Sequence, residues 1–444
     1  MRESKSTFNV LASVEKHIEA LKPLLPRQAI VCIGEYPIKT LLKEPGIAKD
    51  GPLPILIDKS SDEIYKWIPR GFRAHHVLGF EDEKVETHFW FNILPTIAKD
   101  ETVLDSLKRR SIEKLHGALI FASTWDGMGS AGMPAFISKL KASSINSFSI
   151  ALLPSKLQPI DAQFNTYAAL TRCQTIDGAA VLLIDRDHLE SYESVSRQGE
   201  AIRGPAVANY LVNLFLSKET FVDEVTELSR TFNSKLFSIV LVTGASYKIF
   251  GSIENMLNTA LLKPLLTFDL SSSKLLYVLL RMPESLKDKL PRGKIELAIA
   301  NWFKDRADLD SVYITEPVYT EDMNDRIDVA LLIGGFDTSG MFANLEKRTQ
   351  TLKNKSVERG LMTVDWQVPK APEPEPQTKH AETPAIQVEA PKTTVETPQP
   401  VVSTETVAET KPEAATVETP KEEPKAEAKP RRARRTRQTQ KEKV

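Results

Sequence analysis

The chain is poor in the residues that would indicate several common classes of protein. Its 444 residues include two cysteines, Cys32 and Cys173, too few for a disulfide framework and at no metal-binding spacing. No stretch approaches eighteen consecutive apolar residues, and the N-terminus carries no apolar signal region. We therefore expect a soluble protein of the cytoplasm without a resident metal. The formal net charge of -1 favours no polyanionic partner.

The composition changes near residue 368. Residues 369–428 contain eleven prolines, twelve acidic residues and six lysines but no aromatic residue. Such a segment buries too little apolar surface to offset the entropy of ordering, so we predict a disordered tail over 369–444. The tip of this tail, 429–443, reverses the charge with five arginines and three lysines against one glutamate. The basic tip suits an anionic membrane, nucleic acid or an acidic protein partner, or it is only a solubilising end.

Five short apolar runs upstream of the tail predict a parallel sheet. They are QAIVCIG (28–34), PILID (54–58), GALIFAS (117–123), SFSIALLP (147–154) and GAAVLLID (178–185). Continuous rather than alternating hydrophobicity is typical of strands buried on both faces. Helical patterns such as TVLDSLKRRSIEKLHG lie between several of these runs, which predicts a doubly wound, mostly parallel α/β domain.

A second, smaller α/β unit follows. The apolar segment PAVANYLVNLFLSKETF predicts a long central helix, and four further strands with two helices lie between residues 237 and 336. The predicted divisions are a helical extension at 1–27, the doubly wound domain at 28–204, the central helix with an acidic loop at 205–232, the smaller domain at 233–345, a linker at 346–368 and the tail at 369–444.

The chain has only 19 glycines, yet three of them, with a serine and a proline, fall within eight positions of STWDGMGSAGMPAF (123–136). This stretch follows a predicted strand and precedes a predicted helix. In a parallel sheet, the backbone amides of such a turn and the helix dipole can hold a phosphate group. Taken alone, the pattern is equally typical of a tight turn without a ligand.

The glycine-rich stretch resembles the phosphate-binding loop of the tubulin/FtsZ superfamily, GGGTGSG, which continues as Ala-Ala-Pro in FtsZ proteins. Further segments resemble that family in the same order, namely ALLPSKLQPIDAQFNTYAAL, AAVLLIDRDHLESY, ANYLVNLF and SIENMLNTALLKPLLTFDLSSSKLLYVLLRMPES. The resemblance covers about residues 28–340. It implies a Rossmann-like GTPase domain, a long central helix, a smaller α/β domain and head-to-tail assembly into filaments for cell division or shape.

The resemblance also implies which residues form a site for GTP with Mg²⁺. The positions aligned with the family's nucleotide contacts are Gly34, Asp58, Gly127, Met128, Gly129, Ser130, Ala131, Arg186 and Asn209. In FVDEVTELSRTF, Glu224 and Glu227 align with the acids that enter the nucleotide pocket of the next subunit and orient the attacking water. Their i, i+3 spacing places both carboxylates on one helical face, which is also typical of an ordinary solvated helix.

Several positions depart from the family pattern. Gly34 alone remains of the first loop's glycines, and Pro37 carries no N–H. Four acidic residues within 81–86 stand where the family senses the γ-phosphate, and Arg186 replaces the asparagine that reads guanine. Trp125, in the glycine-rich stretch, either stacks on a base or fills the space of a nucleotide.

Two functions from different classes follow from this pattern. The first is a cytoskeletal GTP-binding protein, and a possible GTPase, that polymerises with copies of itself. The second is a pseudo-GTPase scaffold or regulator that keeps the fold without nucleotide turnover and binds partners such as an FtsZ-like filament. An enzyme acting on a small metabolite is a third reading, but no dinucleotide fingerprint follows the first strand.

Overall fold

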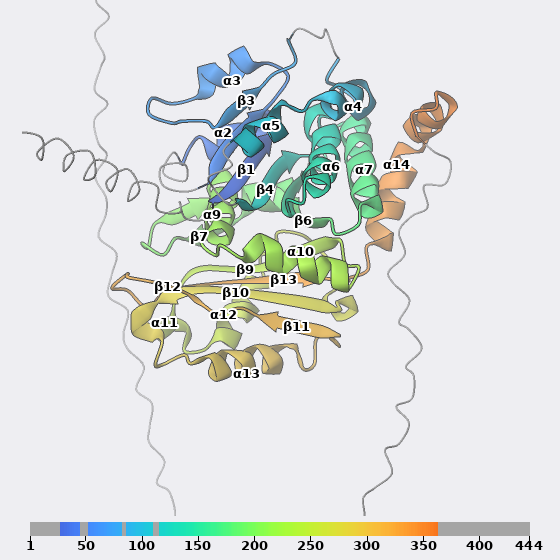
Figure 1. Ribbon diagram of the computed structural model, residues 1–444. Helices are drawn as coiled ribbons and strands as arrows, with labels where there is room; N and C mark the ends of the chain where they lie inside the picture. The colour runs from blue at the N-terminus through green and yellow to red at the C-terminus, as the bar shows by residue number, and fades with distance from the viewer. Residues whose placement is uncertain (1–26, 45–51, 82–85, 110–114, 363–444) are drawn as a thin grey trace, which may run out of the picture. The chain divides into compact units, whose positions relative to one another are not determined.

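The computed structural model describes residues 27–44, 52–81, 86–109 and 115–362. Most of the predicted N-terminal extension, the tail with its basic tip, and residues 82–85 of the acidic segment lie outside these residues. Within the described part, one eleven-stranded sheet runs through the structure, and helices cover both of its faces (Figure 1). No helix of that part is long and apolar enough to cross a membrane.

The first six strands form a parallel half of this sheet, in the order β3-β2-β1-β4-β5-β6. Their bounds are β1 (Arg27–Ile33), β2 (Leu53–Ile57), β3 (His76–Leu78), β4 (Leu115–Ser123), β5 (Ser147–Leu153) and β6 (Ala180–Asp185). The five strands predicted from apolar runs are confirmed. The extra strand, β3, has only three half-buried residues and therefore leaves no apolar run in the sequence.

Two apolar cores, one on each face, hold the helices to this half of the sheet. One face is covered by α4 (Trp90–Lys99), α5 (Thr102–Arg109), α6 (Gly127–Ala142) and α7 (Ile160–Thr175). The other is covered by α2 (Glu35–Leu41), α3 (Ser61–Trp67), α8 (Arg186–Ser191), α9 (Pro205–Leu216) and α10 (Phe221–Thr231). Fully buried aromatics such as Trp90 and Phe148 anchor the two cores, and each such side chain contributes roughly 1.5–3 kcal/mol. The predicted doubly wound architecture is confirmed.

The second half of the sheet continues from β6 through β9, although those two strands pair at only two positions. It comprises β9 (Leu236–Ser246), β10 (Leu275–Pro283), β11 (Ser311–Ile314), β12 (Val318–Thr320) and β13 (Arg326–Gly334), with β13 antiparallel to both β9 and β10. A third apolar core lies under α12 (Ile253–Ala260) and α13 (Arg292–Phe303). Smaller elements are α11 (Tyr247–Phe250), η3 (Leu270–Ser272), η4 (Glu284–Leu286) and the hairpin β7 (Glu193–Val195) and β8 (Ala201–Arg203).

Two predicted segments look different in the structure. Residues 205–232 form the two helices α9 and α10 in place of one long helix and a loop. Helix α10 carries the acidic pair, whose i, i+3 spacing had been expected on a helical face. The predicted linker at 346–368 begins inside α14 (Ser339–Glu358), which packs along α7 (Figure 1). The apolar positions of α14 are sparse, and its buried side chains include Thr349, Lys353 and Ser356, so the sequence pattern did not indicate a packed helix.

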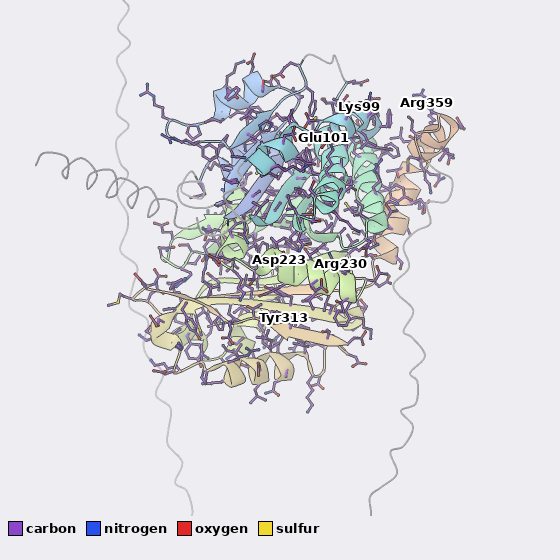
Figure 2. The ribbon with its side chains drawn as sticks, viewed as in Figure 1. Lys99, Glu101, Asp223, Arg230, Tyr313 and Arg359 are labelled. Carbon is purple, nitrogen blue, oxygen red and sulfur yellow. The ribbon has the colours of Figure 1, made fainter. Side chains whose placement is uncertain are left out.

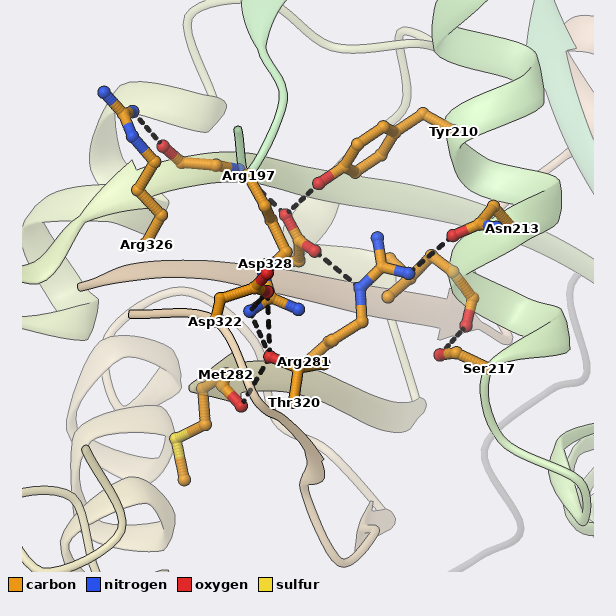
Figure 3. Close-up of polar contacts among 12 residues, drawn as sticks. Arg197, Tyr210, Asn213, Ser217, Arg281, Met282, Thr320, Asp322, Arg326 and Asp328 are labelled. Carbon is orange, nitrogen blue, oxygen red and sulfur yellow. Dashed lines mark hydrogen bonds and ion pairs between the residues drawn. The ribbon is translucent and has the colours of Figure 1, made fainter. Parts of the chain in front are cut away.

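A buried polar network joins α9 to the second half of the sheet (Figure 3). The Asp328 carboxylate on β13 is fully buried and accepts hydrogen bonds from the Arg281 guanidinium on β10 and the Tyr210 hydroxyl on α9, each at 2.8 Å. The same guanidinium donates to the Asn213 side chain at 2.7 Å. A second arginine, Arg197, follows β7 and pairs with Asp322. Charged groups therefore cross the boundary between the two predicted domains.

Candidate functional site

The candidate site lies at the carboxyl ends of β1 and β4. The chain leaves these neighbouring strands toward opposite sides of the sheet, since β1 continues to β2 and β4 to β5. Open α/β sheets bind ligands at such a switch point. A cavity of about 720 Å³ lies there, and helices α2 and α6 begin beside it.

Of the predicted nucleotide contacts, Asp58, Met128 and Arg186 line this cavity. Gly34 sits beside it with a positive φ of 95°, and a Cβ at this position would lie 2.7 Å from the Ser123 hydroxyl. The remaining four positions of the glycine-rich stretch are buried within α6 and do not line the cavity; they are Gly127, Gly129, Ser130 and Ala131.

The predicted asparagine contact, Asn209, reaches the cavity only indirectly. Its side-chain nitrogen donates to the carbonyl oxygen of Thr40, a residue that lines the cavity, at 2.6 Å. Its side-chain oxygen is buried and has no hydrogen-bond partner among the described residues. The structure thus places Asn209 in the wall behind α2.

The glycine-rich stretch is the start of a helix and not a loop. Asp126 is the N-cap of α6, and its carboxylate accepts the Gly129 amide at 2.7 Å and the Ser123 hydroxyl at 2.5 Å. The Gly127 amide donates to the carbonyl oxygen of Thr87 at 3.1 Å. These amides were predicted to hold an anionic ligand, but in the structure their acceptors come from the chain itself.

Close packing explains why these positions are glycine. A Cβ on Gly129 would overlap the carbonyl group of Ser123, and one on Gly127 would overlap the carbonyl oxygen of Thr87. The backbone of 87–89 therefore lies directly on the first turn of α6. The glycines are required by these contacts, with or without a ligand.

Two acidic groups with raised pKa values face this end of the sheet. Burial, with the charges of Asp126 and Glu35, raises the pKa of Asp58 to about 6. Burial also raises the pKa of Asp126, although hydrogen bonds from Gly129 and Ser123 oppose the shift. In the described part of the chain, no group of three His, Cys, Asp or Glu side chains could hold a metal ion.

A cluster that the sequence did not indicate forms one wall of the cavity. The Arg186 guanidinium lies over the rings of both Tyr36 and Trp125, at 5.4 and 5.0 Å from their centroids. The two rings meet edge to face at 5.5 Å, and the Tyr36 hydroxyl donates to the Glu190 carboxylate at 2.9 Å. Only the family alignment pointed to Arg186, and Tyr36 carried no sequence signal, because its partners Trp125, Arg186 and Glu190 lie 89 or more residues away in the chain.

The residues of this site do not fit a nucleotide whose phosphates are held by the α6 amides. A phosphate needs donors there, but the site presents the Asp126 carboxylate and the Thr87 carbonyl. Other donors line the cavity, namely Lys39, Lys43, Lys59 and Arg186. The acids Glu35, Asp58, Glu86 and Asp126 line it as well. An anionic ligand would therefore have to be held by side chains.

The predicted catalytic acids of α10 lie in different surroundings. Glu224 has a side chain only 19% exposed and accepts hydrogen bonds from the Tyr277 hydroxyl at 2.8 Å and the Thr220 hydroxyl at 2.6 Å. Glu227 is 66% exposed and pairs with Arg230 of the same helix at 2.6 Å (Figure 2 labels Arg230). Neither glutamate lines the cavity of its own chain.

Comparison with known proteins yields a match only for the fold, since no family model and no curated protein matches the sequence. CetZ1 from Haloferax volcanii, a GDP-bound monomer, superposes with a TM-score of 0.58 at 13% identity over 74% of this chain and 99% of that chain. CetZ2 from the same organism, a GTPγS-bound protofilament, superposes with a TM-score of 0.57 at 16% identity, over 74% of this chain and 99% of that chain.

A third solved structure, an empty FtsZ dimer from M. jannaschii, gives a TM-score of 0.51 at 15% identity over 72% of this chain and 92% of that chain. The identities are too low to transfer residue roles, so the likeness is one of fold. The likenesses confirm the predicted resemblance, and this chain has the fold of the tubulin/FtsZ superfamily.

Proposed function

We propose that the chain is a tubulin/FtsZ-like scaffold that keeps the fold but has no GTP turnover. The observation that supports this proposal is the Asp126 carboxylate on the Gly129 amide, at the place where the family resemblance puts a phosphate. Two like charges about 4 Å apart near a protein surface repel each other by about 4 kcal/mol. That energy corresponds to roughly a thousandfold loss of phosphate affinity.

A second candidate is the GTP-dependent filament protein. It is favoured by the cavity of about 720 Å³ at the switch point and by the nucleotides named for CetZ1 and CetZ2. In this candidate, GTP with Mg²⁺ binds in the cavity and copies assemble head to tail, which gives open filaments. Glu224 and Glu227 of one copy complete the site of the next, and Glu227 is the more accessible of the two.

Nucleotide binding by the full chain tests these candidates. We expect no turnover of labelled GTP and weak binding of GTP and GDP. The Asp126→Asn variant should bind both more tightly, because an amide still caps Gly129 but carries no negative charge. The matched control is Asp62→Asn, which removes an exposed carboxylate on the nearby helix α3. Equal affinities of the wild type and Asp126→Asn would contradict the role given to Asp126.

Sedimentation in parallel separates the two candidates. The scaffold predicts the same pelleted fraction with GTP, with GDP and without nucleotide. Pelleting that requires GTP would favour the filament-forming GTPase. That candidate also predicts that Glu227→Ala hydrolyses GTP more slowly but binds it with unchanged affinity. The cytoplasmic location stays a prediction. The basic tip at 429–443 lies outside the described residues, so its contacts also stay predictions, whether with membrane, nucleic acid, an acidic protein or an FtsZ-like filament.

A further inference from the structure

A second cavity, of about 260 Å³, lies between helices α4, α6 and α7. Its charged lining residues are Lys139 on α6 and Arg172 on α7, and its hydroxyl groups come from Ser138 and Thr175. The other described lining residues are apolar, so the lining carries two positive charges and no acidic side chain. It is separate from the cavity at the carboxyl ends of β1 and β4, with which it shares no lining residue.

Arg172 is the unusual residue of this cavity. Its guanidinium lies over the ring of the buried Trp90, 5.2 Å from the centroid. No carboxylate, carbonyl or hydroxyl among the described residues accepts a hydrogen bond from its five N–H donors. Burial lowers the pKa of this guanidinium, and the neighbouring Cys173 opposes the shift only in part. Arg172 is half-buried, so its guanidinium is only partly withdrawn from water, and the donors that face the cavity are available to an acceptor from outside the described chain.

Lys139 supplies a second donor from the neighbouring helix. Its side chain is 11% exposed, and its ammonium group donates to the carbonyl oxygen of Asp100 and lies 3.4 Å from the Glu101 carboxylate. Glu101 itself is mostly exposed and lies between α4 and α5 (Figure 2). Because an ammonium group has three donors, one remains for a further acceptor. The fixed contact with Asp100 holds this donor at the edge of the cavity.

We propose that this cavity binds a small oxyanion, a phosphate or a carboxylate group, with Arg172 as its main ligand and Lys139 as its second. The planar guanidinium offers two parallel N–H donors, which match the geometry of both groups. Trp90 holds the guanidinium plane in place, and the three helices limit the space to far less than the 720 Å³ of the first cavity. The ligand is therefore a small anion or the acidic end of a larger molecule.

Isothermal titration of the full chain with inorganic phosphate tests the proposal, at constant ionic strength maintained with sodium chloride. We expect saturable binding to the wild type and a loss of affinity of roughly tenfold or more in Arg172→Gln, because a charge-assisted hydrogen bond is removed. Lys139→Gln should weaken binding less. Arg359→Gln removes an exposed arginine at the end of α14 and is the matched control (Figure 2).

Two further arms keep the result interpretable. Lys39→Gln alters the first cavity, so phosphate binding that weakens in this variant but not in Arg172→Gln would place the ion in the first cavity and overturn the assignment. Titration with acetate in place of phosphate shows whether the site takes a carboxylate as well. If Arg172→Gln does not fold, Arg172→Lys replaces it, and we expect weaker binding because the two-donor fork is lost. Phosphate binding that is absent from the wild type, or equal in wild type and the Arg172 variant, would overturn the assignment.

Discussion

The buried pair of Arg281 and Asp328 provides the sharpest test of how helix α9 is anchored to the second half of the sheet. The Asp328 side chain is 0% exposed and that of Arg281 is 8% exposed, with 2.8 Å between the bonded atoms (Figure 3). Asp328 also accepts the Gly244 amide and the Tyr210 hydroxyl, each at 2.8 Å. The perturbation is Arg281→Met, which preserves much of the side-chain volume and removes the positive charge.

The expected cost follows from what this substitution leaves behind. An uncompensated carboxylate remains buried, and breaking a buried ion pair in this way costs about 3–5 kcal/mol. Adding Asp328→Asn should recover part of that loss, because an amide oxygen still accepts from Gly244 and Tyr210 but carries no charge. The double variant should therefore be more stable than Arg281→Met alone.

Urea unfolding followed by circular dichroism measures these differences, with free energies taken from the midpoints and a common slope. The control is Arg203→Met, which breaks an exposed pair with Glu193 at 3.0 Å and should cost no more than about 1 kcal/mol. A loss below about 1 kcal/mol in Arg281→Met, or a double variant that loses the sum of both single losses, would refute the reasoning. Hydrogen exchange should also quicken in α9, because Asn213 loses its hydrogen-bond donor and Tyr210 loses the guanidinium over its ring.

Three further outcomes follow from single contacts. Burial raises the pKa of Asp58 from 3.8 to about 6, so the folded state binds a proton more tightly than the unfolded state and loses stability as pH rises through that interval. At pH values above 6, Asp58→Asn should therefore unfold at a higher urea concentration than the wild type. Below pH 3.8 the variant should show no such gain. Gly129→Ala should abolish soluble protein, because the new Cβ overlaps a carbonyl group, whereas Gly293→Ala in α13 meets open space and should be neutral or slightly stabilising in a thermal melt. Tyr277→Phe removes a donor from the partly buried Glu224 and should cost about 1.5–3 kcal/mol in urea unfolding; no loss would mean that this hydrogen bond is unimportant.

The fold was predictable from the sequence because its strands are long apolar runs. Segments such as SFSIALLP and LLYVLLRMP are buried over their whole length, and an apolar run of that kind is stable in few places other than the interior of a sheet. The prediction was weaker where burial is partial. Strand β3 and helix α14 have mixed or polar faces, so only their packing partners define them.

The candidate site was predictable in its position but not in its chemistry. A glycine-rich stretch after the third apolar run indicated the switch point, and the cavity lies there. Which acceptor takes an amide depends on atoms brought together by folding: Thr87 reaches Gly127 across 40 residues of chain. The sequence had suggested a ligand for these amides, since a glycine required by packing and a glycine required by a ligand look the same in a sequence.

The order of apolar runs determined the sheet, because hydrophobic burial depends mainly on residue type and spacing. The glycine-rich stretch and the segments after it carried the resemblance to the tubulin/FtsZ superfamily. Only the tertiary structure decided which charges are paired. It joined Arg281 to Asp328, capped Gly129 with Asp126 and left Arg172 without an acceptor among the described residues. Pairing depends on distances of a few ångströms between residues far apart in the chain, and no local pattern in the sequence encodes those distances.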